Sequence, residues 1–77
     1  MQINVTVAND QKRASIWVED TETLRGAFDK AAVSIGNGMI QLNGDTLGED
    51  HLDKSFAQCG VTGRTATLSS TVKSVGN

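Results

Sequence analysis

Apolar and polar side chains alternate along two segments near the start of the chain. Residues 2–7 and residues 12–18 each place an apolar side chain at every second position, and residues 8–11 between them are rich in turn formers. A period of two is typical of a strand that is covered on one face only. Two such strands joined by a short polar connection predict a β-hairpin.

The apolar spacing changes to that of a helix after residue 20. One stripe of positions separated by three or four residues consists of Leu24, Ala27, Phe28, Ala31 and Ile35. This spacing predicts an amphipathic helix with one apolar face. We expect Asp20 or Thr21 to cap its first turn and residues 36–38, Gly-Asn-Gly, to end it.

The second half of the chain contains shorter extended segments. Residues 39–42 predict a third strand, the Asn-Gly pair at 43–44 predicts a tight turn, and residues 65–72 alternate again. Between them, Leu52 and Phe56 are spaced as in a single helical turn packed against a core. The order β-β-α-β-β in one small domain predicts an α+β, β-grasp architecture, with a mixed sheet of four to five strands and one helix packed on one face.

The order and spacing of these elements resemble the ubiquitin superfamily over nearly the whole chain. The segments that carry the resemblance are residues 1–3 (Met-Gln-Ile), 18–21 (Val-Glu-Asp-Thr), 42–47 (Leu-Asn-Gly-Asp-Thr-Leu), and Leu52 with 65–68 (Thr-Ala-Thr-Leu). The resemblance implies a ubiquitin-like β-grasp domain over residues 1–73, with its last strand in the centre of the sheet. Residues 74–77 are expected to form a flexible C-terminal tail.

The tail departs from the pattern of the conjugated members of this superfamily. Ubiquitin-type modifiers and the related sulfur carriers end in Gly-Gly, and an activating enzyme adenylates the terminal carboxylate. Here residues 73–77 read Lys-Ser-Val-Gly-Asn, so removal of Asn77 would leave Gly76 as a single terminal glycine. A conjugated modifier or sulfur carrier matured at Gly76 is therefore the alternative function, and a non-enzymatic interaction or adaptor module is the first.

The open sheet face also departs from the superfamily. Most receptors of ubiquitin read an apolar patch on this face, and the matching positions here are Gln41, Thr67 and Ser69, all of them polar. Some bacterial ubiquitin-like proteins, including those encoded beside type VII secretion systems, also lack the diglycine. This chain resembles them in size, and they look like adaptor or regulatory subunits.

Trp17 is the strongest candidate for a functional side chain. The alternation of its strand places it on the polar face, away from the predicted helix. Exposed tryptophans are enriched among the hot spots of protein interfaces. The predicted protein-binding surface consists of Trp17, Gln2, Asn4, Met39 and Gln41. In the other interpretation, a strand slip or bulge turns Trp17 inward, or the stems of Lys12 and Arg13 cover it.

Length and charge narrow the classes of partner. The chain has 77 residues, enough for one domain, and a net charge of −2 with its seven cations scattered along the sequence. Nucleic-acid binders concentrate positive charge on one face, so no nucleic-acid partner is expected. A membrane-spanning helix needs a run of about 20 apolar residues, which the chain lacks, so no association with a membrane is expected either. We expect an unidentified protein partner, a monomer or weak dimer, and a cytoplasmic location.

The residue types that carry catalysis or bind metals are sparse. Cys59 is a single cysteine, and with His51 it falls short of the four ligands of a structural zinc site. The acidic segment 45–53 lacks the ligand spacing of a calcium-binding loop. Cys59 is interpreted as a small buried apolar group rather than a nucleophile. We therefore expect no enzyme activity, no metal and no cofactor.

Overall fold

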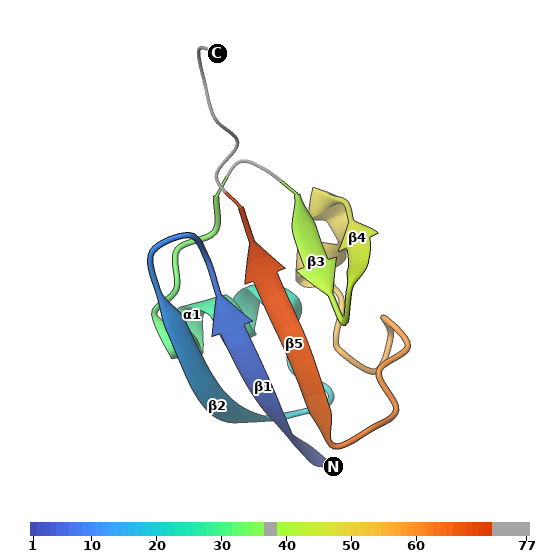
Figure 1. The fold of residues 1–77 in the computed structure, drawn as a ribbon. Helices are drawn as coiled ribbons and strands as arrows, with labels where there is room; N and C mark the ends of the chain where they lie inside the picture. Colours follow the sequence, from blue (N-terminus) through green and yellow to red (C-terminus); the bar gives the residue numbers. More distant parts are fainter. Residues whose placement is uncertain (37–38, 72–77) are drawn as a thin grey trace.

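The computed structural model describes residues 1–36 and 39–71, which form one sheet and one principal helix (Figure 1). In chain order the elements are β1 (Gln2–Ala8), β2 (Arg13–Glu19), α1 (Leu24–Ala31), β3 (Ile40–Leu42), β4 (Asp45–Leu47), the 3-10 helix η1 (Glu49–Asp53) and β5 (Thr65–Ser70). The strand order is β2-β1-β5-β3-β4. β1 pairs with β5 in parallel and the other pairs are antiparallel, so the predicted mixed sheet is confirmed.

The alternation along β1 divides the sheet into two faces. Ile3, Val5 and Val7 are completely buried beneath α1, while the residues between them point to the other face. From the helix, Leu24 and Phe28 complete this core. Burial of one strand face and one helix stripe is what the sequence periods require, because each element hides its apolar side chains against the other.

The central position of β5 confirms the expectation for the last strand. β5 lies between β1 and β3, where its residues Ala66 and Leu68 add to the core. Because β5 pairs with β1 in parallel, the first and last described strands lie side by side in the interior of the sheet. The sheet therefore has β2 and β4 as its two edges.

α1 begins later than the sequence predicts. Thr23 is the N-cap, and its hydroxyl accepts a hydrogen bond of 3.0 Å from the Gly26 N–H. The predicted caps, Asp20 and Thr21, precede this position. The reason lies in the loop after η1, where the Ala57 N–H donates to the Asp20 carbonyl over 3.0 Å and draws this backbone out of the helix.

α1 also ends earlier than predicted. Ala32 takes the left-handed conformation with φ of 56°, and the Val33 N–H closes the helix end on the Phe28 carbonyl at 3.0 Å. Ile35, the last member of the apolar stripe, lies beyond the helix and packs against the core only in part. A left-handed alanine costs about 1–2 kcal/mol, which the burial of Val33 on the core offsets.

The β3–β4 hairpin forms at the predicted turn. Asn43 and Gly44 have positive φ angles of 52° and 89°, the signature of a two-residue hairpin turn. After the hairpin, Leu52 lies in η1, but η1 ends before Phe56, so the single helical turn expected to contain both residues is wrong. Both side chains are nonetheless buried in the core.

The described residues end at 71. The predicted domain boundary at residue 73, the tail 74–77 and Gly76 lie outside the described residues.

Candidate functional site

The open face of the sheet carries Trp17 on its outer strand. The side chain of Trp17 is 58% exposed, and β2 pairs with β1 in an unbroken register in which Trp17 lies opposite Asn4. The strand slip that would turn the indole inward is therefore absent from this pair. The exposed large apolar side chains of the described residues are Met1, Trp17 and Met39, and Met39 is 62% exposed.

The immediate surroundings of Trp17 are polar and well ordered by hydrogen bonds. The Asn4 side-chain amide donates to the Ser15 hydroxyl over 3.0 Å and to the Ile16 carbonyl over 3.2 Å. These two bonds tie Asn4 to β2 and hold its side chain beside the indole. Trp17 therefore lies on a strand that is paired with β1 along its whole length, and not on a loop.

The strand register divides the five predicted binding residues into two sets. We call Trp17, Asn4 and Gln2 the Trp17 corner, and Met39 with Gln41 the Met39 corner. Gln41 of β3 lies opposite Ser69 of β5, three strands from β2 and at the other end of the sheet.

The separation of the two corners follows from sheet geometry. Three strand spacings of about 4.8 Å and a shift of about four residues place Gln41 roughly 20 Å from Trp17. The structure brings Trp17, Asn4 and Gln2 together, because Gln2 lies two residues before Asn4 on β1. It does not bring Met39 and Gln41 to them. Between the corners lie Thr67 and Ser69, so the middle of the face is polar, as expected.

The backbone of Trp17 faces the outer edge of the sheet. The Asn4 N–H donates to the Arg64 carbonyl on the β5 side, over 2.8 Å, so Asn4 and Trp17 form a pair without mutual backbone hydrogen bonds. The Trp17 carbonyl instead accepts from Lys30 Nζ, which reaches across from α1 at 2.9 Å. Sequence reasoning missed Lys30, because its spacing marks it only as a residue off the apolar stripe.

Charged groups gather at the C-terminal end of β2, next to the Trp17 corner. The Met1 ammonium lies 3.3 Å from the carboxylates of Glu19 and Asp20. The hydrogen bond to Glu19, followed by that to Asp20, raises the pKa of the Met1 α-amino group. All three groups are at least partly exposed to solvent, so their ion pairs contribute little to the stability of the fold. Their main effect is to place charge near the Trp17 corner.

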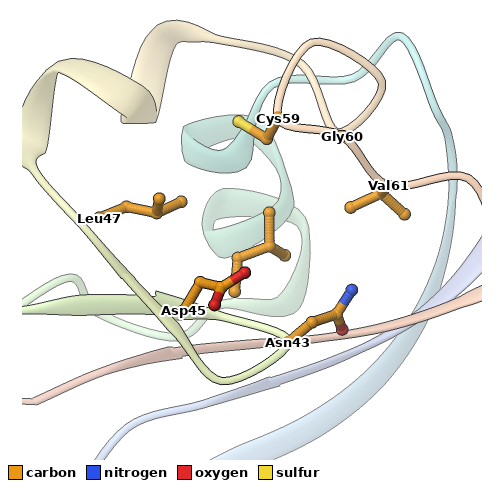
Figure 2. A pocket seen from close by; sticks show the side chains of 7 residues that line it. Asn43, Asp45, Leu47, Cys59, Gly60 and Val61 are labelled. Carbon is orange, nitrogen blue, oxygen red and sulfur yellow. The ribbon is translucent and has the colours of Figure 1, made fainter.

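A small hollow lies behind the β3–β4 hairpin (Figure 2). Its volume is about 80 Å³, and it is lined by Leu42, Asn43, Asp45, Leu47, Cys59, Gly60 and Val61. Figure 2 shows Cys59 and Val61 facing Asn43 and Asp45 across it. Pockets for small organic ligands usually measure about 300–1,000 Å³, so this hollow is too small for one.

Cys59 is one of the residues that line this hollow. It is partly buried against the core, and burial raises the pKa of the thiol, with nearby Lys54 opposing the shift. A raised pKa keeps the thiol protonated at neutral pH, where a nucleophile needs a thiolate. His51 is not among the residues around this hollow, and its Nδ1 lies 3.3 Å from the Asp50 carboxylate instead.

Within residues 1–36 and 39–71, no group of three or more histidine, cysteine or acidic side chains is arranged to hold a metal ion. In the same part of the chain, no helix is long and apolar enough to cross a membrane.

Comparison with solved structures identifies the architecture. The chain is similar to the ubiquitin-like domain of an Arabidopsis thaliana protein, with a TM-score of 0.68 and 22% identity over 99% of this chain and 82% of that one. A second structure of the same plant protein gives a TM-score of 0.59 and 25% identity, covering 99% of this chain and 92% of the other. No family model and no curated protein sequence matches. The chain therefore has a ubiquitin-like β-grasp fold.

Proposed function

We propose that this ubiquitin-like β-grasp domain is a non-enzymatic interaction or adaptor module whose contact surface is centred on the Trp17 corner. The observation that carries the proposal is a 58% exposed indole on a regular, paired strand. Tryptophan is expensive to leave in water and is strongly enriched among residues that dominate binding energy. No other aromatic side chain of the described chain is exposed, because Phe28 and Phe56 are buried.

The paired strands β1 and β2, which carry Trp17, support a contact of this kind. Asn4 is held by two hydrogen bonds to β2, so the surface beside the indole is ordered before a partner arrives. Preorganisation lowers the entropy cost of association. A matching partner presents an apolar cavity for the indole and polar groups around it. With a net charge of −2, the chain offers little attraction to nucleic acid.

Met39 provides a matched control for the test. It is about as exposed as Trp17 and lies directly before β3 of the same sheet, but it belongs to the opposite corner. Immobilised wild-type protein, Trp17→Ala and Met39→Ala are compared for proteins captured from host extract. We expect a partner whose affinity falls by about thirtyfold with Trp17→Ala, a loss of roughly 2 kcal/mol, and is kept by Met39→Ala.

A partner that binds both variants equally would contradict the proposal, and so would one lost only with Met39→Ala. Circular dichroism of each variant shows that the fold is retained, since both side chains are exposed. The cytoplasmic location stays a prediction. The capture experiment would identify the partner.

The alternative of a modifier or sulfur carrier concerns residues 72–77, outside the described residues. Intact-mass measurement of the protein from its native host, with and without a denaturing wash, separates the two functions. A free chain ending at Asn77 supports the adaptor, whereas loss of Asn77 or a covalent adduct on Gly76 supports the modifier.

A further inference from the structure

The outer edge of β2 is a long, regular strand edge. β2 has seven residues, and β1 is its neighbour in the sheet (Figure 1). Because Trp17 and Asn4 form a pair without mutual backbone hydrogen bonds, the N–H and C=O groups of Trp17 point away from β1. The same alternation points the backbone groups of Arg13 and Ser15 outward. Exposed strand edges of this length are templates for a further strand.

The residues of β2 are self-complementary when the strand is read against itself. In the sequence Arg-Ala-Ser-Ile-Trp-Val-Glu, the central residue is Ile16, with a cation at one end and an anion at the other. Two copies aligned antiparallel about Ile16 place Arg13 of each copy opposite Glu19 of the other. The same alignment sets each Trp17 opposite Ser15 of the second copy.

We propose that β2 pairs antiparallel with β2 of a second copy of this chain, centred on Ile16, to form a continuous ten-stranded sheet. The occupant is a second copy because charge complementarity selects it: the pairing forms two Arg13–Glu19 contacts, related by a two-fold axis. Backbone hydrogen bonds join Ser15 of each copy to Trp17 of the other, since both residues direct their backbone groups outward.

The inner face of β2 supports the same register. Ala14 and Ile16 are only partly buried, although both point to the core side of the sheet. The pairing sets Ile16 against Ile16 of the second copy and Ala14 against Val18. It therefore covers the apolar side chains that α1 leaves incompletely shielded, and both helices lie on one face of the joined sheet.

Lys30 makes the pairing weak. In the monomer, Lys30 Nζ donates a hydrogen bond to the Trp17 carbonyl over 2.9 Å. In the dimer, the Ser15 N–H of the second copy would donate to the same carbonyl, so the two donors compete. A lysine on an edge strand is a usual defence against unwanted pairing. One strand pair also buries far less than the roughly 1,200–2,000 Å² of a stable interface. The dimer is thus expected at high micromolar to millimolar concentration.

Charge reversal tests the register directly. Arg13→Glu creates two Glu–Glu contacts in the homodimer, and Glu19→Arg creates two Arg–Arg contacts, so each variant is expected to dimerise at least about tenfold more weakly. An equimolar mixture of the two restores both opposite-charge contacts. Sedimentation velocity over a concentration series should therefore show dimer in the wild type and the mixture, and monomer in each variant alone.

Lys54→Glu is the matched control, because it reverses a charge on an exposed residue that follows η1 and is not part of β2. It should dimerise like the wild type. The wild type remaining monomeric up to millimolar concentration would overturn the proposal. Failure of the mixture to recover dimer would overturn it as well, since other registers do not bring Arg13 and Glu19 together.

Cysteine trapping gives an independent reading of the alignment. In a Cys59→Ser background, Ile16→Cys places two thiols opposite each other at a Cα separation of about 4.5 Å, within the range of a disulfide. Ala14→Cys places its two thiols about 13 Å apart, which is beyond that range. Mild oxidation should cross-link only the first variant. Equal cross-linking of both would contradict the proposed register.

This inference stands apart from the proposed partner contact. The two-fold axis lies perpendicular to the sheet, so Trp17 stays on the open face in the dimer. Arg13→Glu removes the dimer and leaves Trp17 in place. A partner captured by Arg13→Glu but not by Trp17→Ala would support the adaptor function, whatever the sedimentation result.

Discussion

β2 and β4 are the two edge strands of one sheet, and they offer very different lengths of backbone for pairing with a further strand. β2 runs for seven residues, and its outer backbone is met by one lysine side chain from α1. β4 runs for three residues and is followed after Gly48 by η1, so little regular edge is available there. Short edge strands and edge lysines are both defences against strand addition. The comparison indicates that further interactions of this sheet concentrate on β2.

The segment that follows β4 and η1 is anchored in the core by Phe56. Phe56 is completely buried, and its N–H donates to the Glu22 carbonyl over 3.1 Å, which joins the segment after η1 to the start of α1. We expect Phe56→Ala to lower the free energy of unfolding by about 3–5 kcal/mol, much of the stability of so small a domain. Chemical denaturation followed by circular dichroism measures the change.

Phe56→Leu is the graded control and should lose less than about 1.5 kcal/mol, because most of the buried volume is kept. A loss for Phe56→Ala as small as that for Phe56→Leu would show that the fold does not depend on this ring.

The hairpin turn that leads into β4 carries the next largest effect. The Thr67 N–H donates to Asn43 Oδ1 over 2.9 Å, and the Asn43 N–H donates back to the Thr67 carbonyl over 2.8 Å. Asn43→Ala removes the side-chain acceptor and puts an alanine at positive φ, so we expect a loss of about 1–2 kcal/mol in unfolding free energy.

Asn43→Gly separates the two contributions, since glycine accepts the positive φ but also lacks the acceptor. It should lose less than Asn43→Ala in the same denaturation experiment. If the two variants were equally stable, the left-handed backbone would contribute nothing and the hydrogen bond would account for the whole effect.

The smallest change in stability is expected on the β2 edge. Lys30→Met removes the ammonium group from the Trp17 carbonyl at an exposed position, so the unfolding free energy should change by no more than about 0.5 kcal/mol. Dimerisation should nonetheless strengthen several-fold, because the carbonyl is left open to a second strand. Sedimentation velocity compares the variant with Lys54→Met, for which no strengthening is expected. An unchanged or weaker dimer for Lys30→Met would refute the defensive role of Lys30.

The ends of α1 show where sequence reasoning failed. The apolar stripe identified the helix, but not that Thr23 caps it or that Ala32 ends it. Both boundaries depend on distant partners: the Asp20 carbonyl is taken by Ala57, and Val33 is buried on the core. Local preference for Asp20 as a cap and for glycine as a stop was overridden by hydrogen bonds and burial across the fold.

The sequence by itself determined the elements and the faces of this protein. A period of two along β1 and β2 assigned Val5 to the core and Trp17 to the open face, and the Asn43–Gly44 pair specified a turn, because each of these preferences is local. Tertiary structure alone decided which outward residues are neighbours. The strand order places β1 and β5 between β2 and β3, which separates Met39 from Trp17 and leaves β2 at an edge, since strand order arises from long-range pairing and shared core packing.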